Sequence, residues 1–281
     1  MRIFLLILII IFTYGCSTLI HFKKLSLRID RIAEEAGFRK EYINIEGFNL
    51  LTYQKFKGFS KHLRIYIEGD GRAWETKTKL SKDPTPLNPI ALRLAIIDSF
   101  DNIAYIARPG QFSSLDSKPC DPVYWSTRRF SPEVINAFNK IIDILKEKSK
   151  AESVELVGYS GGAAIAVLVA AQRRDVLSIR TVAGNLNTEE FCNYHKVSKL
   201  EGSINPLEVA EKIASIPQRH FVGSKDKVIP FTIVESFVKK YKDKNCQSIS
   251  IIEGLTHNKG WQKHWKRLLS MQLVVPKQQS K

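Results

Sequence analysis

The sequence predicts an α/β fold in which a mostly parallel sheet of about eight strands is covered by helices on both faces. Short apolar runs that are typical of strands alternate with longer helical patterns along the chain, and this alternation is typical of parallel sheets. Of the 281 residues, 44% are hydrophobic and 25% are charged. The chain can therefore bury a large core, and its composition is not that of a disordered protein.

The first half of the chain begins with a hairpin and contains one strong helix start. Ser131 precedes Pro132 and Glu133, and these residue types suit the cap and the first turn of a helix. The apolar residues that follow recur at helical spacing. The elements expected in this half are strands 42–45, 50–53, 64–68 and 102–107 and helices 88–98 and 131–145.

The second half continues the alternation. A strand at 152–158 leads into residues 163–171, which are apolar on every side and therefore predict a buried helix. No linker is long enough to divide the chain, so a single domain is expected. The remaining expected elements are strands 179–183, 219–223 and 249–252 and helices 206–215, 231–241 and 261–269.

The N-terminus has the pattern of an export signal. Residues 3–12 are apolar and follow Arg2, and the small residue Gly15 precedes Cys16. This pattern resembles the lipobox of bacterial lipoproteins, in which the cysteine is lipid-modified. An uncleaved anchor helix over 3–20 and simple secretion are the alternatives.

These patterns divide the chain into four parts. We expect a signal peptide at 1–15, a tether and N-terminal segment at 16–40, the folded domain at 41–272 and a flexible tail at 273–281. The expected location is the bacterial cell envelope, on a membrane and facing the periplasm or in the outer membrane.

The chain is basic, with a formal net charge of +15. Residues 1–150 hold 24 basic and 16 acidic side chains, and the remainder hold 19 and 12, so the charge is spread evenly. A nucleic-acid partner is not expected, because such proteins concentrate basic charge on one element. A surface that faces anionic lipid or glycan fits this charge better.

The cysteines do not indicate a metal site. Cys120, Cys192 and Cys246 remain besides Cys16, and no Cys-x-x-Cys or His-x-x-x-His pair occurs, so a structural zinc site is not expected. The chemistry predicted below needs no metal or other cofactor. In an exported chain, one disulfide between two of these three cysteines is an open alternative.

The strongest motif for chemistry is Gly-Tyr-Ser-Gly-Gly at residues 158–162. It lies at the end of a predicted strand and opens the apolar helix, which is the context of a nucleophile elbow. Gly158 and Gly162 leave the room that a sharp turn around Ser160 needs. We expect Ser160 to be the nucleophile and the N–H of Gly161 to donate to the substrate oxygen. An ordinary tight turn with an idle serine is the alternative.

A base and an acid should follow the serine in the chain. Asp226 comes just after the predicted strand 219–223, and His257 comes just after strand 249–252. We expect His257 to take the proton of Ser160 and Asp226 to orient the imidazole. Glu253 is the alternative acid, and a surface turn is the alternative role for Asp226.

A second oxyanion donor should come from the glycine-rich loop after strand 64–68. We expect the N–H of Asp70 to be this donor, with Gly69 or Gly71 as alternatives, because glycines let the backbone approach the substrate closely. The alternative is an ordinary turn.

Several further stretches resemble a family of bacterial α/β-hydrolases that are often described as lipoproteins. The resemblance covers roughly residues 40–270 and implies an α/β-hydrolase fold with a minimal lid and an envelope location, but no particular substrate. A cysteine is common in the family where this chain has Gly110, which implies that a disulfide to Cys120 is missing. The stretches are 66–71, 83–86, 107–111, 124–131, 182–186 and 202–206.

Loops at the carboxyl ends of the strands supply candidates for the substrate pocket, since ligands bind at that edge of open α/β sheets. Each candidate could equally support the loops. Residues 185–206 are the only candidate for a small lid, and their polar composition argues against long-chain triglycerides. The pocket candidates are Trp74, Gln111, Tyr124, Trp125, Arg128 and Asn185.

The sequence thus predicts a membrane-tethered serine hydrolase that cleaves an ester or related acyl bond. The substrate is expected to be an acyl-bearing small molecule, lipid or glycan. An acyltransferase that uses the same three residues, and a non-catalytic binding module on the same fold, are the alternatives.

Overall fold

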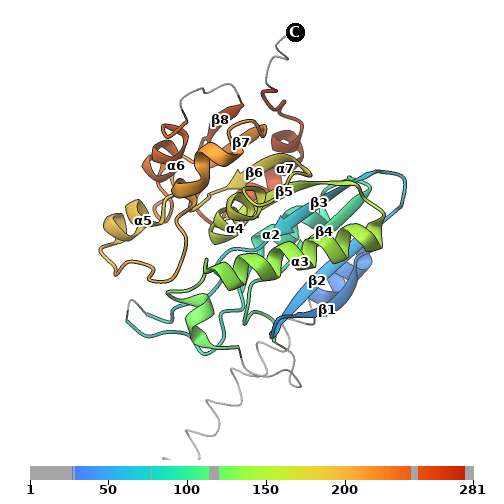
Figure 1. Cartoon of the computed structure of the whole chain (residues 1–281), viewed down its shortest axis with the longest axis horizontal. Coiled ribbons are helices and arrows are strands. Elements are labelled where there is room, and N and C mark those ends of the chain that lie inside the picture. The colour runs from blue at the N-terminus through green and yellow to red at the C-terminus, as the bar shows by residue number, and fades with distance from the viewer. Residues whose placement is uncertain (1–26, 28, 77, 114–119, 242–245, 276–281) are drawn as a thin grey trace, which may run out of the picture.

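The computed structural model describes residues 27, 29–76, 78–113, 120–241 and 246–275. These residues form an α/β-hydrolase fold around an eight-stranded sheet of order β1-β2-β4-β3-β5-β6-β7-β8 (Figure 1). The first two strands form an antiparallel hairpin, β2 is antiparallel to β4, and β3 to β8 run parallel to one another. The strands are β1 (Arg39–Ile45), β2 (Phe48–Phe56), β3 (His62–Ile67), β4 (Asn102–Ile106), β5 (Ser153–Tyr159), β6 (Val176–Val182), β7 (Gln218–Gly223) and β8 (Gln247–Ile252).

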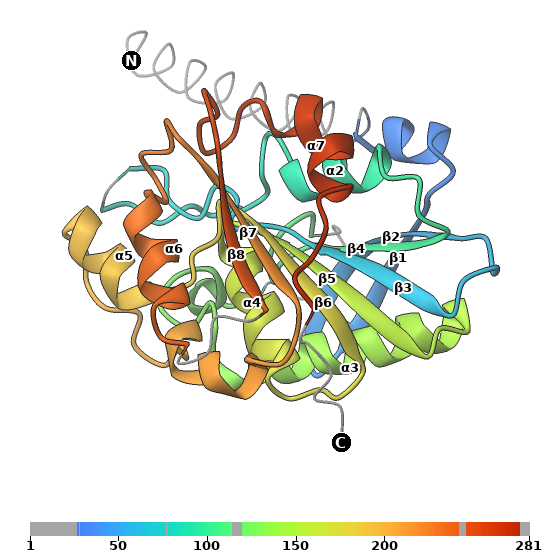
Figure 2. The same ribbon diagram turned by 90° about the horizontal axis from the view of Figure 1, so that it is seen from above.

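Helices cover both faces of the sheet, as Figure 2 shows. One face packs against α3 (Pro132–Ser149), α4 (Gly161–Ala170) and α6 (Phe231–Val238). The other packs against α2 (Ile90–Ile96), α7 (Trp261–Leu269) and a helical segment at 29–35. The remaining helices are α5 (Thr188–His195) and the 3-10 helices η1 (Pro122–Trp125) and η2 (Pro206–Ile213).

The central strands bury apolar residues on both sides because both faces of the sheet are covered. In β3, Leu63 and Ile65 belong to the core beneath α3 and α4, whereas Tyr66 belongs to the core beneath α2 and α7. Every residue of α4 is buried, which explains why this helix is apolar all round.

The structure refines three expectations about the elements. The helix predicted over 206–215 is a 3-10 helix over 206–213, and the lid candidate 185–206 contains α5, which was not predicted. The segment expected to be a tether contributes Ile29, Ala33 and Phe38 to the core, so the folded domain begins well before residue 41.

The predicted signal peptide 1–15, the lipidation site Cys16 and most of the predicted tail 273–281 lie outside the described residues. Within the described part of the chain, no helix has both the length and the apolarity needed to cross a bilayer. Cys120, Cys192 and Cys246 are all free thiols. The disulfide that the sequence left open is therefore absent among these three cysteines, which lie before η1, within α5 and just before β8.

Candidate active site

The turn between β5 and α4 holds Ser160 in a conformation that side chains rarely adopt, with φ 51° and ψ −118°. Backbone hydrogen bonds to β6 and to the loop after β6 fix this turn. The N–H of Ser160 donates to the carbonyl of Val182 at 2.9 Å, and its carbonyl accepts the N–H of Asn185 at 3.0 Å. Strain of this kind persists only where surrounding structure enforces it and is typical of functional sites.

The two flanking glycines are needed for close packing. A Cβ atom on Gly158 would lie 2.4 Å from the Cα of Ala163, and one on Gly162 would lie 2.2 Å from the carbonyl oxygen of Ile67. The strand, the turn and the helix can therefore close on one another only with glycine at both positions. This confirms the steric reason for the spacing of the motif.

Ser160, His257 and Asp226 form a hydrogen-bonded chain. His257 Nε2 lies 3.1 Å from Ser160 Oγ, and its Nδ1 lies 2.9 Å from Asp226 Oδ2. The other oxygen of Asp226, Oδ1, accepts the backbone N–H groups of Val228 and Ile229 at 2.8 and 2.9 Å. Since the Asp226 side chain is fully buried, these bonds fix its orientation toward the imidazole.

Two aromatic side chains hold the loop that carries His257. Neither role was predicted from the sequence. The hydroxyl of Tyr159 donates to the carbonyl of His257 at 3.1 Å, and Trp261 Nε1 donates to the same oxygen at 2.8 Å. Tyr159 occupies the variable position of the elbow motif, so the motif itself gave no signal for this contact.

The alternative acid Glu253 and two other histidines, His220 and His195, do not join these hydrogen bonds. Glu253 is exposed beyond the end of β8, whereas Asp226 contacts His257 directly. His220 is completely buried in β7, where its Nδ1 lies 2.9 Å from Thr181 Oγ1. Burial lowers the pKa of His220 to about 3. His195 is at the end of α5, with Nε2 2.8 Å from the carbonyl oxygen of Val228.

The loop of residues 68–71 lies directly on the elbow. A Cβ atom on Gly69 would lie 3.1 Å from the Cβ of Ser160, and one on Gly161 would lie 2.1 Å from Asp70 Oδ1. Gly161 begins α4, so its N–H has no partner within the helix. The N–H of Asp70 meets no acceptor among the described residues. Both can therefore donate to a substrate oxygen.

Gly69 cannot serve as an oxyanion donor in this structure. Its N–H donates to the side chain of the preceding residue, Glu68, with Oε1 at 3.0 Å. The Glu68 carboxylate is fully buried, and it also accepts the N–H groups of Ala91 and Leu92 at the start of α2, at 3.4 and 3.5 Å. Burial raises the pKa of Glu68 to about 7. The expectation for Gly69 is thus corrected, because Glu68 already occupies its N–H.

The side chain of Asp70 accepts hydrogen bonds from two arginines. No sequence motif had placed these arginines in the site. Arg108 Nη1 donates to Asp70 Oδ1 at 3.1 Å, and Arg129 Nη1 donates to Oδ2 at 2.8 Å. Burial raises the pKa of Asp70, but Arg129 and Arg108 outweigh burial and hold this pKa below its usual value. Both arginines fall in stretches that carry the family resemblance, which was their only signal.

Three of the pocket candidates brace loops. Gln111 is buried, and its Nε2 donates to the carbonyl of Gly69 at 2.9 Å. Trp125 is buried, and its Nε1 donates to the carbonyl of Ser81 at 3.1 Å. Asn185 is buried, and its backbone N–H donates to the carbonyl of Ser160 at 3.0 Å. These three do not line an open pocket, because their side chains lie inside the fold.

The other pocket candidates are more accessible. Trp74 is 42% exposed. Tyr124 is partly buried against the edge of Phe48, with 4.8 Å between ring centroids. Arg128 pairs with Glu133 at the start of α3. Trp74 and Arg128 are therefore the exposed members of the six candidates.

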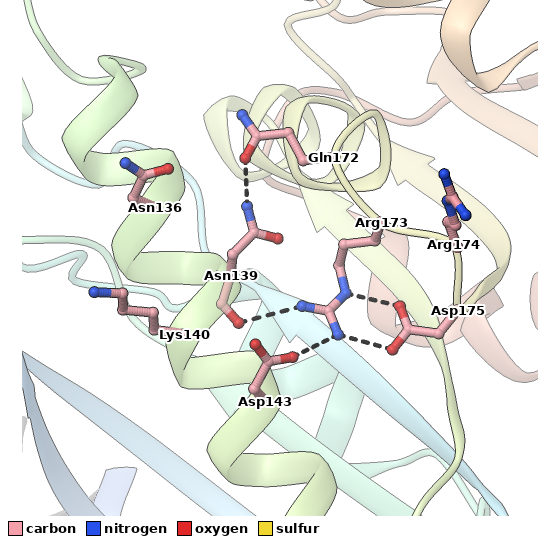
Figure 3. A pocket seen from close by; sticks show the side chains of 8 residues that line it. All are labelled: Asn136, Asn139, Lys140, Asp143, Gln172, Arg173, Arg174 and Asp175. Atoms are coloured by element: carbon pink, nitrogen blue, oxygen red, sulfur yellow. Dashed lines mark hydrogen bonds and ion pairs between the residues drawn. The ribbon is translucent and has the colours of Figure 1, made fainter.

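A surface cavity of about 550 Å³ lies beside α3 (Figure 3). Arg173 reaches from the end of α4 and pairs with Asp143 and Asp175 at 2.7 and 2.8 Å. Asp175 directly precedes β6, so this cavity is at the amino edge of the sheet, whereas Ser160 follows the carboxyl end of β5. The two ion pairs of Arg173 link α3 to the start of β6.

Among the described residues, no group of three or more His, Cys, Asp or Glu side chains is arranged to hold a metal ion. The arrangement at the carboxyl edge of the sheet instead combines a serine in a strained turn, an imidazole and a buried carboxylate. These groups can support nucleophilic chemistry by themselves.

Comparison with known proteins defines the class. Residues 111–258 match the serine hydrolase family FSH1. The match covers slightly more than half of the chain, which is therefore a serine hydrolase that belongs to this family. No curated protein matches the sequence.

Solved structures share the fold at low sequence identity. An α/β serine hydrolase homologue from Coxiella burnetii is 16% identical, with a TM-score of 0.57 over 82% of this chain and 93% of the other. Est1E from Butyrivibrio proteoclasticus is 14% identical, with a TM-score of 0.55 over 82% and 97%. The esterase Pf2001 from Pyrococcus furiosus is 12% identical, with a TM-score of 0.58 over 84% and 90%.

Proposed function

We propose that this serine hydrolase cleaves an ester or related acyl bond through an acyl-enzyme. The observation that carries the proposal is the hydrogen-bonded chain from Ser160 Oγ through His257 to the buried Asp226. A carboxylic ester is the favoured substrate, because an alkoxide leaves more readily than an amide nitrogen. The choice of an ester is also supported by the shared fold of the esterase Pf2001 and of Est1E.

The reaction has two halves. His257 Nε2 takes the proton of Ser160 Oγ while Oγ bonds to the acyl carbon, and the same proton then goes to the departing alcohol as the acyl–oxygen bond breaks. Water next gives a proton to His257 as it attacks the acyl-enzyme, and His257 returns this proton to Ser160 Oγ as the acid leaves. The N–H groups of Gly161 and Asp70 stabilise the oxyanion in both halves.

A panel of p-nitrophenyl esters of increasing chain length, together with a peptide substrate, tests the proposal. We expect ester hydrolysis by the wild-type chain, strongest for short acyl groups, and none by Ser160→Ala or His257→Ala. Equal rates for Ser160→Ala and the wild type would refute the assignment of the nucleophile. Addition of alcohol acceptors separates the alternatives, since an acyltransferase would form new esters at the expense of free acid.

We further propose that the chain is a lipoprotein attached through Cys16, which would face an anionic membrane. A groove of about 630 Å³ supports this proposal because four basic side chains line it. Arg39 and Lys148 also pair with Glu41, and Lys57 pairs with Asp101. The basic residues are Arg39, Lys55, Lys57 and Lys148. Such a groove attracts anionic headgroups.

A further inference from the structure

We propose that Asp70, clamped between Arg108 and Arg129, is a positioning residue that holds its own backbone N–H in place as the second oxyanion donor. This inference rests on the proposed acyl chemistry. It extends that chemistry by giving the Asp70 carboxylate, which touches neither Ser160 nor His257, a role in the rate of the reaction.

The clamp is rigid because the arginines are themselves fixed. Besides its bond to Asp70, Arg108 donates from Nη2 to the carbonyl of Arg129 at 2.6 Å. Arg129 donates from Nε to the carbonyl of Ser126 at 2.8 Å. The side chains of Arg108 and Arg129 are 4% and 9% exposed. Each oxygen of Asp70 therefore meets a donor that cannot swing away into solvent.

The rest of the loop is held on both sides of Asp70. The carbonyl of Gly69 accepts Gln111 Nε2, and the N–H of Arg72 donates to the carbonyl of Pro84 at 2.9 Å. Gly71, with φ 64°, allows the turn that brings its neighbour close to Pro84. The Asp70 side chain is a further anchor of this residue, whose N–H meets no acceptor among the described residues.

If its negative charge were the main effect of Asp70, this residue would slow the reaction. A carboxylate beside Gly161 opposes the negative charge that develops on the substrate oxygen. Removing it would favour the transition state if its charge were the main effect. If geometry is the main effect, the same change releases the loop and slows the reaction. The sign of the change in rate therefore decides between the two readings.

The test is Asp70→Asn, which preserves the shape and removes the charge. We expect kcat for a p-nitrophenyl ester to fall about 10²-fold, as for a misplacement of about 1 Å, with KM changed less than threefold. An alkylboronic acid, whose Ser160 adduct mimics the oxyanion, should bind more weakly by a factor that matches the loss in kcat/KM. A purely structural role would not produce this match.

Asp98→Asn is the matched control. Like the partly buried Asp70, Asp98 pairs with an arginine, Arg64, at 2.8 Å. Asp98 is buried and follows α2, whereas Ser160 follows β5. We expect this variant to lose thermal stability and keep kcat. Arg129→Gln is the second test variant, because it removes one ion pair and leaves the Arg108–Asp70 pair. We expect it to fold and to lose about tenfold in kcat.

The outcomes separate the two proposals. A wild-type chain without ester hydrolysis would overturn the proposed function and this inference together. An active wild type with Asp70→Asn and Arg129→Gln at or above its kcat would overturn this inference alone. An equal loss of kcat in Asp98→Asn would also overturn it, because the effect would then be a general consequence of a broken buried ion pair.

Discussion

Three side chains perform the proposed chemistry through their oxygen and nitrogen atoms. A different kind of contact fixes each of these residues. Ser160 is held by main-chain bonds, Asp226 by two N–H groups, and His257 by its neighbours Tyr159 and Trp261. The positions of the three could be predicted, because a motif and chain order specify them.

The residues around the three could not be predicted in the same way. Whether Gln111 or Trp125 faces a ligand or the interior depends on contacts between loops that are far apart in the sequence. The engagement of Gly69 by Glu68 depends on a side-chain rotamer that no motif encodes. The sequence named Asp70 for its backbone, and only the structure shows the two arginines on its side chain.

Asp226→Asn should lower kcat about 10³- to 10⁴-fold, because an amide in place of the carboxylate favours the wrong tautomer of His257. The measurement is initial-rate kinetics on a p-nitrophenyl ester. Glu253→Ala is the control and should keep the wild-type rate, since Glu253 is exposed. Activity that survives in Asp226→Asn and disappears in Glu253→Ala would reverse the assignment of the acid.

At the scale of elements, the strands were predicted within a few residues, because alternation and apolar runs mark them clearly. Of the two helices between β6 and β7, the helix over 206–215 was predicted and α5 was not. Residues 188–195 form α5 despite their polar composition, and residues 206–213 form a 3-10 helix. A short helix with little apolar surface depends on its caps and on tertiary contacts more than on periodicity.

Gly162→Ala tests the contact between α4 and β3. The added Cβ would meet the carbonyl oxygen of Ile67 at 2.2 Å, so the helix or the strand must shift. We expect the free energy of unfolding, measured in urea, to fall by about 2 kcal/mol, and the ester rate to fall as well. An unchanged unfolding midpoint would show that the elbow has more room than the structure indicates.

The buried position of His220 between β6 and β7 predicts how the stability of the fold depends on pH. Its pKa of about 3 is below the value of 6.5 for an unperturbed histidine, so the unfolded chain binds a proton more readily. Stability should therefore be lost as pH falls below 6.5. This loss amounts to about 2 kcal/mol at pH 5.

The measurement is urea unfolding at pH 7.5 and pH 5. His220→Gln should remove most of this loss, whereas His62→Gln, at an exposed position of β3, should not change it. The same pH dependence in His220→Gln and the wild type would contradict the account of His220.

At the scale of the whole molecule, the basic groove and the serine lie at opposite edges of the sheet. Lys55 and Lys57 lie at the end of β2, beside the start of β4, whereas Ser160 follows the end of β5. A chain that meets a membrane through this groove therefore presents Ser160 away from the lipid. This orientation favours a substrate that arrives from the aqueous side.

The groove makes a prediction for membrane binding. A version that begins after Cys16 and carries no lipid should bind vesicles that contain anionic phospholipid more than neutral vesicles in sedimentation assays. Lys55→Glu combined with Lys57→Glu should abolish the difference. Lys199→Glu combined with Lys239→Glu changes the net charge equally, at exposed positions near α5 and α6, and should preserve it. Equal binding to both kinds of vesicle would contradict the membrane proposal.

The central claim is that Ser160 is an activated nucleophile, and labelling with a fluorophosphonate probe tests it most directly. The account predicts one label on the folded wild-type chain, mapped by mass spectrometry to Ser160, no label on Ser160→Ala, and much slower labelling of His257→Ala. A folded wild-type chain that stays unlabelled, or that is labelled at another residue, would contradict the account.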